Sequence, residues 1–227
     1  MWNIFKFNQE TSNELANIKK YLIASMNGVV SENMKHLGYK LNYGVSLLRI
    51  KELASRFKPS DNLADCLWKS DCREMMIMAT LLHPEETFDE KKALKWSSYC
   101  TNMELAEQFS RNLVAKKAYA SSVACKLLNS SHETMERALA YLLAATADKE
   151  NAINKDDFDF IFQQAEKDIY SPNANLYASV ARFLKQASTK DLAKTNQFLE
   201  NLDTEKGPGC AWVREEVRTY IEYAPTK

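Results

Sequence analysis

The chain has almost no residues that bend the backbone sharply over most of its length. No glycine occurs between Val45 and Lys206, and proline occurs in that span only at Pro59, Pro84 and Pro172. Folds rich in β-strands need turn residues far more often, because each strand is followed by a reversal of the chain. The sequence therefore predicts an all-α protein, with the three prolines at helix ends.

Apolar residues in the stretch from Tyr43 to Pro84 recur at intervals of three and four positions, as Leu48, Leu53 and Phe57 illustrate. This is the spacing of helices that bury one face. The breaks between the apolar stretches are short. Consecutive helices therefore have to fold back on one another as antiparallel neighbours.

Capping residues divide the chain into helices at regular intervals. Ser46 and Ser60 each precede an apolar stretch, and Thr101-x-x-Glu104 has the pattern of a capping box. The expected helices form pairs close to the roughly 40-residue unit of HEAT-type repeats, which stack into a curved array with a concave face. A compact helical bundle is the structural alternative. The pairs are expected near residues 61–83, 88–117, 118–147, 155–187 and 190–223.

The composition is that of an ordinary globular domain. The chain has 227 residues, of which 45% are hydrophobic and 26% charged, and we expect a single domain over residues 1–227. Neither a signal peptide nor an apolar run of the roughly 20 residues that a membrane span needs is recognisable. We therefore expect a cytoplasmic protein, monomeric and without membrane contacts.

The sequence offers no cofactor or metal site. It contains no glycine-rich phosphate-binding loop, no HExxH motif and no GxSxG motif. The five cysteines include no CxxC pair, and the three histidines are scattered. Reduced cysteines within the helix packing are therefore expected, rather than disulfides or a zinc site.

Four short motifs follow one another along the first part of the chain. They are Tyr43-Gly44-Val45, Leu48-Arg49, Leu67-Trp68 and Arg73-Glu74. In the pattern and order of these motifs, and over nearly its whole length, the chain resembles the DNA alkylation repair glycosylases of the AlkD-like family. The resemblance implies a HEAT-like helical stack that binds double-stranded DNA containing alkylated bases, with no cofactor.

The resemblance implies a function in DNA alkylation repair. It includes recognition of alkylated DNA and, where activity is retained, hydrolytic removal of N3- or N7-alkylpurines. In that chemistry the positively charged leaving base already weakens the N-glycosidic bond, so one carboxylate and a water suffice. The alternative is a non-catalytic HEAT-like scaffold that binds DNA or protein, which a net charge of zero favours.

By the same resemblance, Glu107 takes the position of an aspartate that supports the cationic sugar, and Met103 takes that of an aromatic residue. Glutamate keeps the charge on a longer side chain, whereas methionine has no aromatic face to offer a cation. The alternative for Glu107 is a solvated position on a helix surface. Glu104 is expected to close the capping box with Thr101. The resemblance implies that Glu107 is the catalytic candidate.

Basic side chains recur along the predicted repeats, as contacts with successive phosphates require. Arg137 matches an arginine that faces the DNA groove in the related family, and a helical pair with Glu133 is the alternative. The lysines are equally compatible with exposed, solubilising helix faces. Tyr39 and Tyr43 flank glycines, where an exposed ring could touch a ligand. The predicted DNA contacts are Lys69, Arg73, Lys95, Arg111, Lys116, Lys117, Lys126 and Arg137.

Overall fold

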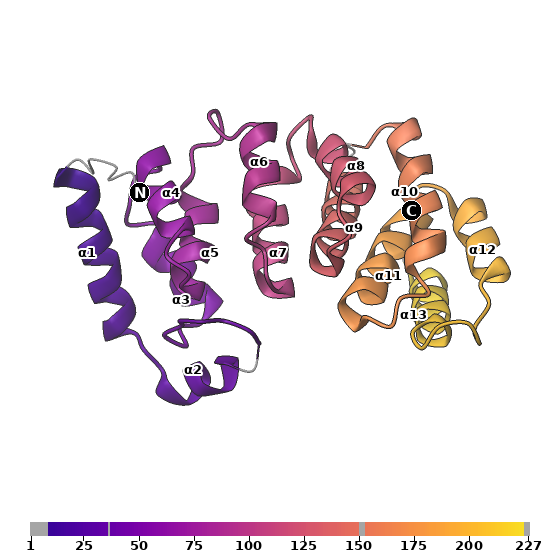
Figure 1. Cartoon of the computed structure of the whole chain (residues 1–227), viewed down its shortest axis with the longest axis horizontal. Coiled ribbons are helices and arrows are strands. Elements are labelled where there is room, and N and C mark those ends of the chain that lie inside the picture. The colour runs from indigo at the N-terminus through magenta and orange to yellow at the C-terminus, as the bar shows by residue number, and fades with distance from the viewer. Residues whose placement is uncertain (1–8, 36, 150–152, 225–227) are drawn as a thin grey trace. The chain divides into compact units, whose positions relative to one another are not determined.

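The computed structural model describes residues 9–35, 37–149 and 153–224, and these residues are helical with no strand among them (Figure 1). Their one β-type pairing is an isolated bridge between Leu41 and Cys72. The predicted all-α class is therefore confirmed. The chain divides after Asp89 into two compact units. The single domain over residues 1–227 and the continuous concave face stay predictions.

The core of the first unit centres on α5, whose residues are almost all buried. The helix α4 contacts both α1 and α5, and α3 packs on α5. Two of the predicted caps, Ser46 and Ser60, are confirmed: the Ser46 hydroxyl accepts the Arg49 N–H at 3.3 Å, and the Ser60 hydroxyl accepts the Leu63 N–H at 3.4 Å. The helices are α1 (Gln9–Ala24), α2 (Gly28–Lys35), α3 (Leu47–Ala54), α4 (Asp61–Trp68) and α5 (Arg73–Leu82).

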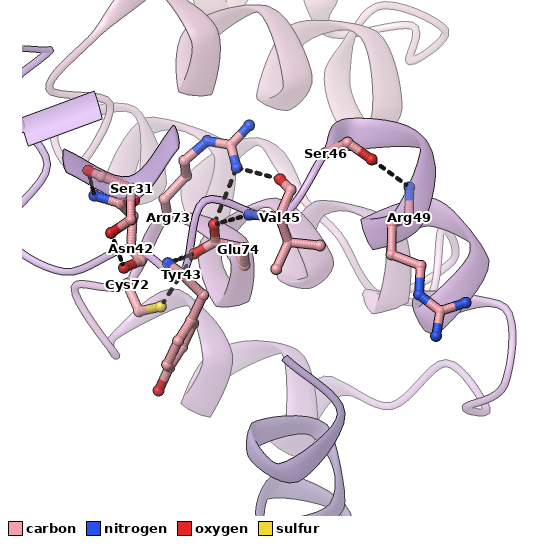
Figure 2. A network of polar contacts seen from close by, with 9 residues as sticks. All are labelled: Ser31, Asn42, Tyr43, Val45, Ser46, Arg49, Cys72, Arg73 and Glu74. Carbon is pink, nitrogen blue, oxygen red and sulfur yellow. Dashed lines mark hydrogen bonds and ion pairs between the residues drawn. The ribbon is translucent and has the colours of Figure 1, made fainter. Parts of the chain in front are cut away.

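A buried ion pair at the start of α5 holds the loop that precedes α3 (Figure 2). The Glu74 side chain is fully buried, and its two carboxylate oxygens accept the backbone N–H groups of Tyr43 at 3.0 Å and Val45 at 3.1 Å. The Arg73 guanidinium donates to the Val45 carbonyl at 2.7 Å and to Glu74 at 3.1 Å. This network also draws the rings of Tyr39 and Tyr43 into the interior, so the prediction that they are exposed is wrong.

Gly44 lies between these two anchored residues and touches the beginning of α2. Its φ of +67° is in the left-handed region, which side chains other than glycine rarely adopt. A Cβ atom added there would lie 2.3 Å from the Asn27 carbonyl oxygen and 2.5 Å from the Ser31 nitrogen. The Ser31 hydroxyl also donates to the Asn42 carbonyl at 2.9 Å. The loop and α2 are therefore tied together by close backbone contact.

The second unit is built from successive helix pairs arranged in two rows (Figure 1). In one row α7, α9, α11 and α13 follow one another in contact, and in the other α6 contacts α8, which contacts α10. These helices confirm the four predicted pairs that follow α4 and α5. They are α6 (Glu90–Ser97), α7 (Met103–Phe109), the π-helical turn η1 (Ser110–Val114), α8 (Ala120–Ser130), α9 (Thr134–Lys149), α10 (Lys155–Asp168), α11 (Ala174–Ser188), α12 (Leu192–Asn201) and α13 (Cys210–Tyr223).

Arg137 links three helices of the second unit. Its guanidinium donates to the Leu128 carbonyl at 2.6 Å, to the Ser131 carbonyl at 3.2 Å and to the Asp168 carboxylate at 2.7 Å. Tyr141, one turn further along α9, donates its hydroxyl to Asp168 at 2.7 Å. Burial and the neighbouring carboxylate raise the pKa of Tyr141 well above its usual value, so its hydroxyl keeps the proton that this bond requires.

Gly44→Ala tests the contact between the loop and α2, and Gly38→Ala is its matched control. Both glycines have positive φ, but no atom lies within 4 Å of the Cβ position at Gly38. Each change carries the strain of a left-handed alanine, about 1–2 kcal/mol. We expect Gly44→Ala to lower the free energy of unfolding by about 1–3 kcal/mol more than Gly38→Ala, because it also overpacks the loop. Equal midpoints in urea unfolding would show that the loop can move away from α2.

Arg137→Ala tests the link between α8, α9 and α10. The side chains of Arg137 and Asp168 are only 15% and 12% exposed, so removing the arginine leaves a mostly buried carboxylate unpaired. We expect a loss of about 3 kcal/mol in the free energy of unfolding. Lys95→Ala, at an exposed position on α6, should cost no more than about 0.5 kcal/mol. If Arg137→Ala lowered the free energy of unfolding no more than Lys95→Ala does, Arg137 would not have a structural role.

Candidate functional site

The carboxylate of Glu107 is held by an arginine from another helix of the same row. Glu107 lies on α7 and accepts a hydrogen bond from the guanidinium of Arg182 on α11. The side chain of Glu107 is 30% exposed and that of Arg182 is 51% exposed, so both remain open to a ligand. Asn102, rather than the expected Thr101, caps α7 by accepting the Leu105 N–H at 3.0 Å.

Met103, at the first turn of α7, also meets α11. Its sulfur lies 3.9 Å from the hydroxyl of Ser179, which is one turn before Arg182. The resemblance places an aromatic residue at Met103, but here a thioether occupies that position, four residues before Glu107 on α7. Met103 therefore provides no aromatic ring that could face a cationic sugar.

A π-helical turn follows α7 and carries Arg111. The backbone N–H of Ala115 bonds to the Ser110 carbonyl at 2.9 Å, and the Ser110 hydroxyl donates to the Ala106 carbonyl at 2.8 Å. Such turns are rare and often occur at functional sites. Arg111 is exposed and lies about one helical turn after Glu107. The exposed arginines Arg111 and Arg182 thus belong to the row of helices that carries Glu107.

The predicted basic residues of the second unit do not all belong to one row. Lys116 and Lys117 follow the π-helical turn, whereas Lys95 lies on α6 and Lys126 on α8, in the other row. The Lys126 ammonium donates to Glu90 at 2.8 Å. This bond and one from the Ser122 hydroxyl lower the pKa of the Glu90 carboxyl. The charge of Lys126 is therefore balanced locally.

Two of the predicted DNA contacts have structural roles instead. The Arg73 side chain is 2% exposed, so its predicted contact with phosphate is wrong. Arg137 is occupied by Asp168 and by two carbonyls, rather than by the predicted alternative partner Glu133 or by an open groove. Lys69 lies exposed after α4 in the first unit, and its DNA contact stays a prediction.

Nothing in the local sequence marks Arg182 as the partner of Glu107. The two residues lie 75 positions apart, and the pairing arises only because α7 and α11 meet in the folded unit. A periodic pattern reports which face of a helix is buried, but it does not report which distant helix covers that face. Arg182 is therefore the residue that the structure adds to the candidate site.

The cysteines are all free. Burial raises the pKa of Cys72 to about 11 and that of Cys125 to about 12, so both thiols stay protonated at neutral pH. Within the described ranges, no three His, Cys, Asp or Glu side chains form a group suited to a metal ion. No helix in the described part of the chain combines the length and apolar character needed to cross a membrane.

Comparison with known proteins supports both the fold and the family. No curated protein sequence matches the chain. A solved structure described as "a new family of proteins related to the HEAT-like repeat DNA glycosylases with affinity for branched DNA structures" aligns with a TM-score of 0.74 and 14% identity. The alignment covers 90% of this chain and 94% of the other, and it confirms the HEAT-like fold. The model of the family described as DNA alkylation repair enzyme matches residues 16–226, and the chain belongs to this family.

Proposed function

We propose that this protein binds DNA in alkylation repair, and that the surface around Glu107 and Arg182 is part of its DNA contact. Membership of the repair family supports DNA as the partner. The structurally similar protein is described as having affinity for branched DNA. The observation that carries the proposal is the ion pair of Glu107 with an arginine that is 51% exposed.

The Arg182 guanidinium has the chemistry of a phosphate contact. Guanidinium groups bind phosphate oxygens through planar, charge-assisted hydrogen bonds. Exposed ion pairs contribute only about 0–1 kcal/mol, so exchanging Glu107 for a phosphate costs Arg182 little. Until DNA arrives, Glu107 keeps the guanidinium in place across α7 and α11. Arg111 adds a second exposed cation on the same row of helices.

Hydrolysis of the glycosidic bond is the second candidate function, and the exposed carboxylate on α7 favours it. A carboxylate paired with a guanidinium offers less stabilisation to a cationic sugar than an unpaired one, because the two charges oppose each other. Arg182 therefore has to leave Glu107 before Glu107 can act. Met103 cannot replace an aromatic ring beside the sugar. Binding without efficient excision is the function that we put first.

Arg182→Gln tests the binding role, and Lys91→Gln, at an exposed position on α6 outside the predicted DNA contacts, is the control from the other row. Fluorescence anisotropy over a range of salt concentrations would measure binding to duplex and to branched DNA. We expect Arg182→Gln to weaken binding about tenfold and to reduce the salt slope by about one, the value for one lost phosphate contact. Lys91→Gln should retain both the affinity and the slope. An unchanged slope for Arg182→Gln would remove Arg182 from the DNA contact.

Release of 7-methylguanine from a methylated duplex separates binding from hydrolysis. We expect the wild-type protein to release the base no faster than the uncatalysed reaction. Glu107→Gln keeps the shape of the side chain and removes its charge. If the wild type is active and this variant loses about a hundredfold or more in rate, hydrolysis through Glu107 replaces the binding proposal. If both are equally active, Glu107 is not the catalytic acid.

A further inference from the structure

Among the exposed large apolar side chains of the first unit, three come from two adjoining segments. Val29 on α2 is 74% exposed, Leu48 on α3 is 80% exposed, and Met26 before α2 is 57% exposed. The Arg49 guanidinium donates to the Ser25 hydroxyl at 3.3 Å, which brings the neighbours of Met26 and Leu48 together. We call these three side chains, Met26, Val29 and Leu48, the apolar tip.

The apolar tip stands on a rigid support. The Asn27 N–H donates to the Tyr43 carbonyl at 3.0 Å, and Gly44 packs directly against Asn27 and Ser31. Tyr43 is in turn held by the buried carboxylate of Glu74 (Figure 2). None of the residues of α2 is fully buried, and its half-buried residues are Val30, Ser31 and Met34, so the exposure of Val29 is not offset by packing in the core. In Figure 1, α2 lies beyond the ends of α1 and α3.

Leu48 points directly away from the core of the first unit. The buried residues of α3 are Ile50, Leu53 and Ala54, which lie on the opposite side of the helix from Leu48. A leucine with this exposure gains nothing from folding, and burying it against a partner contributes about 1.5–3 kcal/mol. The same holds for Val29. The side chains of the apolar tip therefore stay in solvent in the isolated chain, and a partner that covered them would gain their burial.

The apolar tip adjoins a basic segment. Residues 49–58, which follow Leu48 along and beyond α3, contain Arg49, Lys51, Arg56 and Lys58 with Glu52 as their one acid, a net charge of +3. Glu52 is shared by Arg49 at 2.6 Å and Arg56 at 2.8 Å, so one acid serves two arginines. Lys51 is exposed, and its Cα lies about 60° from that of Leu48 around the axis of α3. A polyanion is thus the partner that matches the charge around the tip.

DNA offers both negative charge and apolar surface, which match the basic side chains and the apolar side chains of this region. Its phosphates are anionic, and the apolar faces of its bases become accessible where a base step opens. Apolar wedges of Leu, Ile or Met are inserted between base steps by several classes of DNA-binding protein, while nearby cations hold the phosphates. An acidic protein would match the charge, but it would not require a rigid projecting tip.

We propose that the apolar tip of the first unit inserts into DNA at a base step that opens easily, while the surrounding lysines and arginines contact phosphates. This inference rests on the proposed DNA-binding function. It concerns a different surface from that of Glu107 and Arg182, and it adds unstacking of bases to binding. Leu48 and Val29 form the wedge, and Lys51 is a flanking phosphate contact.

The test uses branched DNA with 2-aminopurine, whose fluorescence rises when the base is unstacked, placed beside the branch point. We expect the wild-type protein to raise this fluorescence on binding. The double substitution Val29→Ser and Leu48→Ser should abolish most of the rise and weaken binding at least about tenfold. Leu192→Ser, at a 48% exposed position on α12, should behave as the wild type. Lys51→Gln should reduce the salt slope by about one while retaining the rise.

The outcomes separate this inference from the proposed function. If the wild type binds DNA and Arg182→Gln weakens it, but the double substitution changes neither affinity nor fluorescence, the wedge is refuted and DNA binding stands. The apolar tip would then be a surface for a protein partner. If the wild type binds no DNA, both proposals fail. Urea unfolding of the double variant should match the wild type, because both side chains are exposed.

Discussion

The buried carboxylate of Glu74 is the constraint on which the first unit depends. A carboxylate without solvent contact is costly unless every available oxygen is engaged, and here two backbone N–H groups and the Arg73 guanidinium engage it. If the loop before α3 rearranged, the buried carboxylate would lose both of its backbone N–H donors. This fixes Gly44 against the start of α2, and α2 in turn holds Val29 in solvent. One interior ion pair thus determines the position of an exposed surface.

Burial also distinguishes the arginines of the second unit. Arg137 and Asp168 are mostly buried, and breaking such a pair costs about 3–5 kcal/mol, so this arginine is not available to a ligand. Arg182 and Glu107 are exposed, and a pair of that kind contributes about 0–1 kcal/mol. A phosphate can therefore compete for Arg182 but not for Arg137. The difference in exposure, rather than in residue type, decides which arginine can contact DNA.

The helices could be predicted from the sequence because their signals are local. The absence of glycine between Val45 and Lys206 excluded most turns, and Ser46 and Ser60 marked helix starts that the structure confirms. The roles of the charged residues could not be predicted in the same way. Arg73 and an exposed lysine look alike in a sequence, because burial of a charge depends on partners supplied by distant segments. Distant segments also decide which residue pairs with Glu107 and whether Leu48 is covered, so neither feature can be read from the local sequence.

Agreement in fold leaves the chemistry of the site undetermined. A TM-score of 0.74 at 14% identity means that the helical scaffold is kept while most side chains differ, and a scaffold of helix pairs can serve binding or hydrolysis equally well. The relevant difference lies at the face of α7 and α11. Hydrolysis requires an uncompensated negative charge beside the sugar, whereas binding requires positive charge beside the phosphates. With Arg182 on Glu107 and a thioether at Met103, the negative charge on this face is compensated, and Met103 provides no aromatic ring. Excision would first require DNA itself to draw Arg182 away, so the occupancy of that one guanidinium connects recognition to any chemistry that follows.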